Sequence, residues 1–255
     1  MRSVLFLAVL LSLCCPLVSQ AQATPRAGLQ KVVVRVPFVG CEADGQVGPV
    51  KAPRGQSKVV SISAAAAQRL AYYKSAYGAG TLAPRGWRCF GTYGSSGSGL
   101  YVGPEPIRPA DLFSPNWKGF SGPVIQISLE DGGTSGRFGV ARTIARVFPA
   151  HSEFVQDVVA EGIEPASSFP SGPYPNDKLT YRNGETVEFQ TPGDTEGLGT
   201  ASRLRKNSSP ISGVAMLVGE ELSLLKLFVR LPPETSDLTQ AIIRQTEHDA
   251  VRLGH

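Results

Sequence analysis

Strands that arrive in consecutive pairs limit this chain to a small set of folds. The clearest pair is LTYRNGETVEF, residues 179–189, in which Asn183 and Gly184 offer the positive φ angles of a two-residue type I′ turn. Short turns of this kind join antiparallel neighbours, so the sequence predicts a sheet built from hairpins. Two further pairs show the same pattern: residues 88–93 with 100–102 around the glycine- and serine-rich run 94–99, and residues 211–219 with 222–231.

Helical segments interrupt these strands without alternating with them one for one. An alanine-rich segment capped by Ser63 predicts a helix over 64–76, and apolar spacing predicts helices over 137–148 and 152–161. A capped amphipathic segment over 236–253 predicts a further helix. Because strands outnumber helices, we predict an α+β fold, in which a mostly antiparallel sheet of hairpins has three to four helices packed on it.

The N-terminus has the composition of a secretory signal peptide over residues 1–23. Arg2 precedes an apolar run over 4–13, and Ala21 and Ala23 are small residues at the positions that signal peptidase prefers. The apolar run is about half of the roughly 20 residues that span a bilayer. We therefore expect an exported protein that is periplasmic or extracellular after cleavage near Ala23.

The four cysteines divide between this leader and the rest of the chain. Cys14 and Cys15 would leave with the leader, and the bulky Leu13 before Cys14 makes a lipid anchor the weaker alternative. Cys41 and Cys89 would remain, and a pair of cysteines in an exported chain favours one disulfide. Closing a loop of this length is worth about 4 kcal/mol in the chain-entropy model. The alternative is two free buried thiols.

Residues 24–255 are expected to form a single α+β domain. The mature length of 232 residues (255 minus 23) suits one large domain or two small ones. The proline-rich segment 164–178 (EPASSFPSGPYPNDK) is either a long surface loop or an internal break between two domains.

Charge and motif content exclude several function classes. Removing the leader removes Arg2 and no acidic residue, which leaves 24 basic and 21 acidic residues and a net charge of +3. These basic residues are scattered, so we expect no nucleic acid partner. We also expect no metal and no cofactor, because the three histidines have no ligand spacing and no nucleotide motif is present. Charged residues interrupt the apolar segment near 211–231, so we expect no transmembrane segment.

Ser121, in GFSGPVI, is the best candidate nucleophile. With Asp131 and His151 it follows the chain order Ser–acid–His of the α/β-hydrolases. That fold needs the serine after a strand in G-x-S-x-G, whereas Ser121 precedes a strand and Pro123 stands where glycine should be. A turn serine is the simpler interpretation, and a serine-type hydrolase using Ser121 and His151 is the alternative.

The loop from Gly132 to Arg137 links a strand to a helix and could hold an anion. Backbone amides at a helix start, with Arg137 nearby, suit a phosphate ester or carboxylate. The GK[ST] ending of a nucleotide-binding loop is absent. Helix capping is the competing interpretation, with Gly133 easing the turn and Thr134 or Ser135 as the cap.

Aromatic and basic residues flank the glycine-rich run. Arg85, Trp87, Tyr93 and Tyr101 could form a ligand-binding platform through stacking or cation–π contacts. In the competing interpretation Trp87 packs against the disulfide and the tyrosines line the sheet.

Together these features predict an exported protein of unassigned activity, with a binding or scaffolding role in the cell envelope. Its partner is unknown, and an envelope protein or a small anionic ligand fits the sequence. Whether the protein is an enzyme is uncertain, and the absence of a credible catalytic set favours a non-enzymatic role.

Overall fold

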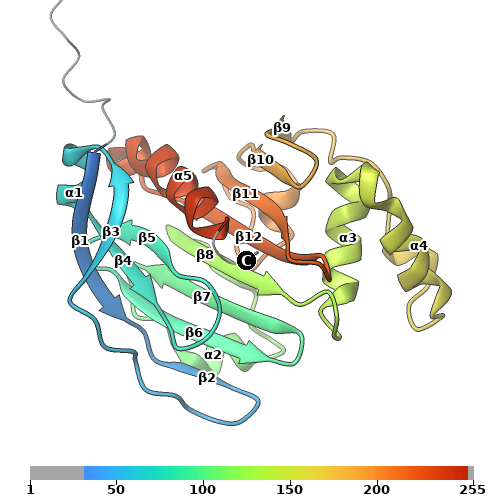
Figure 1. Ribbon diagram of the computed structural model, residues 1–255, viewed down its shortest axis with the longest axis horizontal. Helices are drawn as coiled ribbons and strands as arrows, with labels where there is room; N and C mark the ends of the chain where they lie inside the picture. The colour runs from blue at the N-terminus through green and yellow to red at the C-terminus, as the bar shows by residue number, and fades with distance from the viewer. Residues whose placement is uncertain (1–31, 252–255) are drawn as a thin grey trace, which may run out of the picture.

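The computed structural model describes residues 32–251, so the expected leader lies outside the described residues. This part of the chain contains twelve strands and five α-helices (Figure 1). The strands are β1 (Val32–Gly40), β2 (Ala43–Gly45), β3 (Ser57–Ile62), β4 (Leu70–Lys74), β5 (Thr81–Pro84), β6 (Arg88–Gly94), β7 (Gly97–Gly103), β8 (Val124–Glu130), β9 (Lys178–Tyr181), β10 (Thr186–Thr191), β11 (Ile211–Val218) and β12 (Ser223–Arg230). The helices are α1 (Ala64–Arg69), α2 (Pro109–Phe113), α3 (Arg137–Val147), α4 (Ser152–Ala160) and α5 (Thr239–Ala250).

The strands form two sheets, which we call the small sheet and the large sheet. The small sheet has four strands in the order β3-β1-β4-β5, and the large sheet has eight in the order β2-β6-β7-β8-β12-β11-β10-β9. Only β1 with β4 and β2 with β6 pair in parallel among the described strands. The predicted α+β class with a mostly antiparallel sheet is confirmed, and so are the hairpins β6–β7 and β11–β12.

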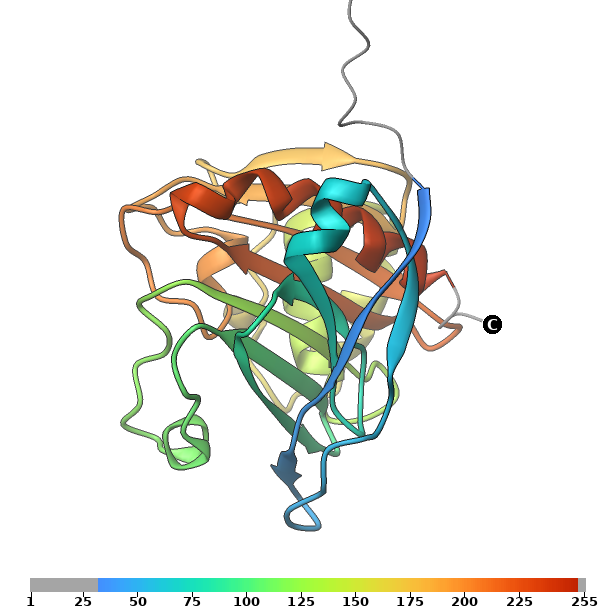
Figure 2. The same ribbon diagram turned by 90° about the vertical axis from the view of Figure 1, so that its left-hand side faces the viewer.

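One face of the large sheet packs against the small sheet and α5. Leu100, Ile125, Ile127 and Leu227 point to this side, where they join side chains of β1, β4 and α5 in the main apolar cluster. Helix α5 contacts strands of both sheets and therefore closes the space between them. Figure 2 shows the small sheet and α1 toward the viewer with α3 behind them.

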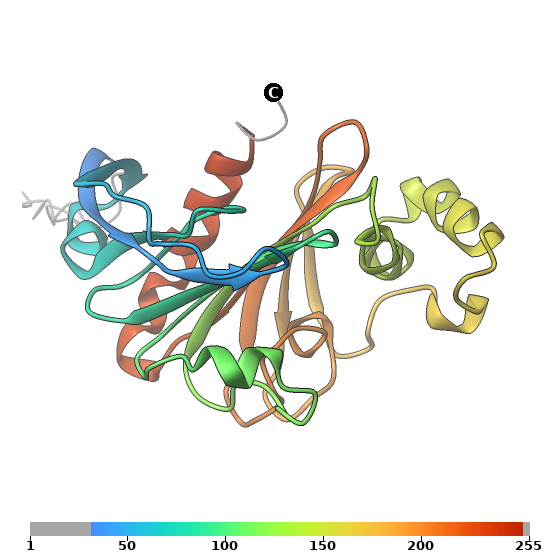
Figure 3. The ribbon, with the colours of Figure 1, turned by 90° about the horizontal axis from the view of Figure 1, so that it is seen from below.

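The opposite face of the large sheet is covered over only part of its width. Helix α3 packs there through Val140, Ile144 and Val147, against apolar side chains of β8, β10, β11 and β12. Helix α4 packs on α3 at the end of the molecule away from the small sheet (Figure 3). Over β6 and β7 this face is covered in part by α2, whose Leu112 packs with Phe90 and Tyr101.

The expected disulfide between Cys41 and Cys89 is present, with the two Cα atoms 5.5 Å apart and the residues 48 positions apart in the sequence. Cys41 follows β1 of the small sheet and Cys89 lies in β6 of the large sheet. The bridge therefore ties the two sheets together on their packed side.

The helix predicted over 64–76 is wrong in its second half. Ser63 does cap α1, and its hydroxyl accepts a hydrogen bond from the amide of Ala66 at 3.2 Å. The helix ends at Arg69, and the next five residues form β4 between β1 and β5. Leu70 and Tyr73 are completely buried there. Burial between two strands, together with the strand preference of tyrosine, outweighs the helix propensity of the alanines.

Two smaller predictions also need correction. The hairpin β9–β10 exists, but its loop has four residues, 182–185, and neither Asn183 nor Gly184 has a positive φ. The Asn183 side chain instead accepts a hydrogen bond from the amide of Glu185 at 3.0 Å, which replaces the tight turn.

The helix count exceeds the predicted three to four because α2 begins directly at Pro109, a residue that is well suited to a first helical turn.

The proline-rich segment 164–178 connects α4 to β9. Phe169 is buried within it and packs with Ala141 of α3 and Val158 of α4.

None of the helices within residues 32–251 combines the length and the apolar character that a membrane crossing requires.

Candidate functional site

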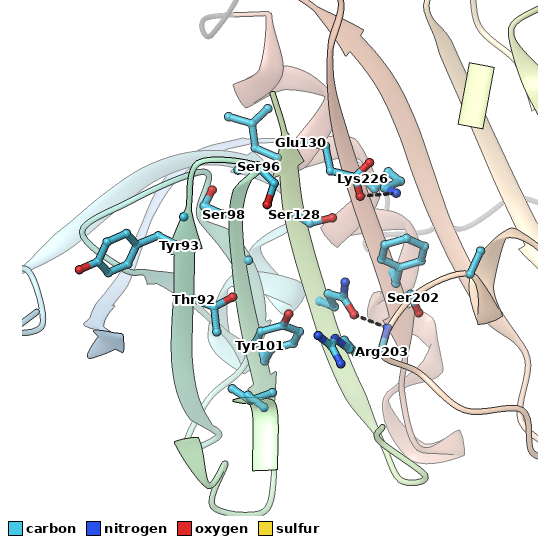
Figure 4. Close-up of a pocket in the computed structure, with 18 of the residues that line it drawn as sticks. Thr92, Tyr93, Ser96, Ser98, Tyr101, Ser128, Glu130, Ser202, Arg203 and Lys226 are labelled. Carbon is cyan, nitrogen blue, oxygen red and sulfur yellow. Dashed lines mark hydrogen bonds and ion pairs between the residues drawn. The ribbon is translucent and has the colours of Figure 1, made fainter. Parts of the chain in front are cut away.

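A polar cleft of about 540 Å³ lies on the face of the large sheet that points away from the small sheet. Its floor consists of β6, β7, β8 and β12, and Figure 4 shows the side chains that line it. A concave site of this volume falls within the range of small-molecule sites in proteins.

Alternate glycines in β7 create the hollow. Gly97, Gly99 and Tyr101 point to the cleft side of this strand, while Leu100 and Val102 point to the apolar core. Gly97 has a φ of +135°, and a Cβ atom there would lie 1.9 Å from the carbonyl oxygen of Leu129. Only glycine fits such a position without strain. The run 94–99 is therefore mostly strand, and its glycines shape a surface instead of only loosening a turn.

Polar side chains alternate with apolar ones along β8, and those on the cleft side line the floor. Gln126, Ser128 and Glu130 point into the cleft, whereas Ile125 and Ile127 between them are buried in the main apolar cluster. This alternation follows directly from the two-residue repeat of a strand. In the neighbouring β12, Lys226 lies opposite Ser128 in the register.

Glu130 and Lys226 form an ion pair at one end of the cleft (Figure 4). The Lys226 Nζ atom lies 2.7 Å from Glu130 Oε1, and the two side chains are 11% and 27% exposed for lysine and glutamate. Two neighbouring atoms, Ser128 Oγ and Glu130 Oε2, are buried and have no hydrogen-bond partner among the described residues. Buried polar atoms usually have a partner, so these two distinguish this end of the cleft floor.

The walls of the cleft come from two segments that are distant in the sequence. Leu112 and Phe113 of α2 form one side, and residues 200–203 form the other. The amide of Arg203 donates a hydrogen bond to Gln126 Oε1 at 2.9 Å, which ties this second wall to the floor. The Arg203 side chain is exposed, and it points across the cleft toward Tyr101 in Figure 4.

Arg230 links the segment that follows the second wall to the segment that precedes β8. It is only 2% exposed, and its guanidinium donates hydrogen bonds to the carbonyl oxygens of Phe120, Gly122 and Arg205. Burial lowers the pKa of Arg230. This contact is structural, because the guanidinium donates its hydrogen bonds to backbone carbonyls of two neighbouring segments.

The residues of the hydrolase hypothesis are not brought together. Ser121 precedes β8 and Asp131 follows it, so a strand of seven residues, or roughly 23 Å, separates them. His151 lies after α3, and its Nε2 atom is 3.8 Å from Glu185 Oε1. The carboxylate next to His151 is therefore that of Glu185 and not that of Asp131, so Ser121, Asp131 and His151 do not form the predicted catalytic set.

The loop from Gly132 to Arg137 has its polar groups occupied by its own surroundings. The amide of Gly133 donates to Asp131 Oδ1 at 2.9 Å, and the Thr134 hydroxyl donates to the carbonyl of Ser95 at 2.6 Å. Arg137 Nε donates to Glu161 Oε1 at 2.7 Å, and this hydrogen bonding raises the pKa of Arg137. Ser135 is exposed and caps no helix. The loop therefore offers few free donors to an anion.

The four residues of the predicted aromatic platform separate into two groups. Tyr93 and Tyr101 line the cleft, and Tyr93 also stacks on Tyr77 with the ring centroids 4.2 Å apart. Arg85 instead donates to the carbonyl of Ala67 at the end of α1, and Trp87 packs against the main apolar cluster. Half of this set therefore belongs to the candidate site.

Sequence reasoning missed the polar residues of the floor. The signal was present, because Gln126, Ser128 and Glu130 occupy every second position of an otherwise apolar strand, and Lys226 interrupts the apolar β12. A charge in the middle of such a strand predicts a partner on the neighbouring strand. What the sequence could not supply was the order of strands, which places β8 next to β12.

Within residues 32–251, no cluster of histidine, cysteine, aspartate and glutamate side chains is suited to hold a metal ion. Comparison with protein-family models, with curated proteins and with solved structures gives no match.

Proposed function

We propose that this chain is an exported binding protein, and that the cleft over the large sheet takes up a small hydroxyl-rich ligand such as a sugar. The observation that carries the proposal is the polar row on the cleft floor. Gln126 and one oxygen of Glu130 are paired, whereas Ser128 Oγ and Glu130 Oε2 have no hydrogen-bond partner among the described residues.

The chemistry of the cleft suits hydroxyl groups. The Glu130 carboxylate accepts hydrogen bonds, the Lys226 ammonium donates them, and the hydroxyls of Thr92 and Ser128 do both. At the opposite end Tyr101 lines the cleft, and its ring packs with Phe90 and Leu112. Because Ser128 Oγ and Glu130 Oε2 are buried, the proposal requires their side chains to rotate when a ligand binds.

Export is supported by the disulfide between Cys41 and Cys89, because such bridges persist in oxidising compartments. The composition of residues 1–23 supports the same location. Mass spectrometry of the protein recovered from its host tests the point: we expect a chain that starts near Thr24 and contains no free thiol.

Binding can be tested by isothermal calorimetry with a panel of neutral and acidic monosaccharides and short oligosaccharides. We expect at least one to bind, and Thr92→Val to weaken its binding about 3- to 10-fold, because one hydrogen bond is worth roughly 0.5–1.5 kcal/mol.

Thr180→Val is the matched control, since Thr180 is an exposed strand residue of β9 that lines none of the cavities described here. It should leave the affinity unchanged. A panel without any binder, or equal effects of the two variants, would contradict the proposal.

A further inference from the structure

A second cavity of about 260 Å³ lies behind the ion pair of the cleft. It shares Glu130, Lys226 and Ala201 with the cleft, so the ion pair stands between the two spaces. Its other side is one face of α3, which contributes residues at helical spacing: Gly139, Arg142, Thr143 and Arg146. The small Gly139 allows the helix to approach, because a Cβ atom there would lie 2.4 Å from Glu130 Oε2.

This second cavity contains an uncompensated positive charge. Arg142 lines it but is neutralised by Glu164, whose carboxylate oxygens lie 2.6 and 2.7 Å from Arg142 Nη2. Arg146 is half-buried and has no carboxylate within ion-pair distance among the described residues. Its guanidinium donates to the carbonyl of Gly172 at 3.1 Å and lies 4.3 Å from the ring centroid of Tyr174.

The cleft has a second uncompensated cation at its other end. Arg203 makes no ion pair with the described residues, and its guanidinium lies 5.9 Å from the ring of Trp117. Since Glu130 and Lys226 neutralise each other, Arg146 and Arg203 leave the joined space with a net positive charge. At the same time Glu130 Oε2 lacks a donor. A ligand that satisfies both conditions carries hydroxyl groups together with a negative charge.

We infer that the cleft and the cavity behind it form one site for an anionic sugar, with hydroxyl groups over the sheet and at Glu130, and a carboxylate or phosphate group at Arg146 and Lys226. This inference rests on the proposed function and specifies its ligand class. Arg146 recognises the charged group in this arrangement, and Arg203 attracts the ligand at the open end of the cleft.

Calorimetry with matched probes tests the inference. Glucose and galactose serve as neutral probes, and their uronic acids and 6-phosphates serve as charged ones. We expect a charged form to bind at least about 10-fold more tightly than its neutral parent, because hydrogen bonds to charged groups are the stronger ones. The comparison of uronic acids with 6-phosphates identifies which anionic group fits.

Arg146→Gln should abolish this preference, whereas Arg146→Lys should keep part of it. Arg54→Gln is the matched control, because it removes a charge from an exposed residue that lines none of these cavities. In the unmodified protein the preference should shrink between about 20 and about 500 mM salt, as screening of a charge requires. This last measurement needs no variant to fold.

Three outcomes would overturn the inference. Equal binding of neutral and charged probes, or a preference that survives both Arg146→Gln and high salt, removes the anionic class and leaves the proposed function intact. Failure of every probe to bind removes both.

Discussion

The two faces of the large sheet differ in what they bury. On the face toward the small sheet, Ile125 and Ile127 of β8 are at most 2% exposed and belong to the main apolar cluster. On the other face the same strand presents Gln126, Ser128 and Glu130 to a cleft. A single strand therefore stabilises the fold with every second residue and offers the remaining residues to a ligand.

The contrast shows why the cleft can be polar without unfolding the protein. The apolar face, the disulfide and α5 anchor the floor, so the residues above it need not contribute to the core. Sites built on strands of a rigid scaffold hold their geometry better than sites on loops. Exchanging residues on the two faces should consequently separate stability from binding.

The largest effect on stability is expected at Gly97, which faces the cleft although the fold depends on its backbone. Gly97→Ala should lower the free energy of unfolding by about 4 kcal/mol, because it combines a strained φ with a clash against the backbone of β8. Chemical denaturation measures the change.

Gly94→Ala is the matched control for that variant. Gly94 pairs with Gly97 in the register, has no positive φ, and would place its Cβ atom in open space. Equal stability of the two variants would show that the hollow does not depend on the backbone of Gly97.

A smaller loss is expected from the packed face. Ile127→Ala should reduce the free energy of unfolding by about 3 kcal/mol, since it deletes methyl and methylene groups from a side chain that is 2% exposed. Denaturant unfolding measures this loss, and calorimetry on the folded variant should find the ligand affinity unchanged. A strong loss of affinity with little loss of stability would reverse the roles that we assign to the two faces.

The smallest change in stability is expected at Ser128, which follows Ile127 in the sequence. Ser128→Ala should alter the free energy of unfolding by less than about 1 kcal/mol, because it removes a hydroxyl without a partner among the described residues. The affinity for the ligand should fall several-fold, as calorimetry can measure. A stability loss as large as that of Ile127→Ala would mean that the cleft floor belongs to the core.

Local features of the fold could be predicted where neighbours in sequence are also neighbours in space. The hairpins β6–β7 and β11–β12 are of this kind, and so is the cap of α1 by Ser63. The prediction failed for β4, where the helix propensity of the alanines gave way to pairing with β1 more than thirty residues earlier in the chain. The prediction of a tight turn at Asn183 was wrong for a related reason, since an asparagine side chain can complete a longer turn as well as a tight one.

The candidate site was less accessible to prediction than the fold. Tyr93 and Tyr101 flank a conspicuous glycine-rich run, whereas the hypothesis for Ser121, Asp131 and His151 rests on their order in the chain. The pairing of Glu130 with Lys226 joins residues almost a hundred positions apart, and no local pattern encodes it.

The sequence by itself predicted the α+β class, the hairpins and the pairing of Cys41 with Cys89, because residue preferences and short turns act locally and only these two cysteines lie outside the expected leader. Only the tertiary structure decided that β8 lies between β7 and β12, that α3 stops short of β7, and that a polar cleft results. The physical reason is that strand order and helix placement depend on contacts summed over the whole chain, to which any one segment contributes little.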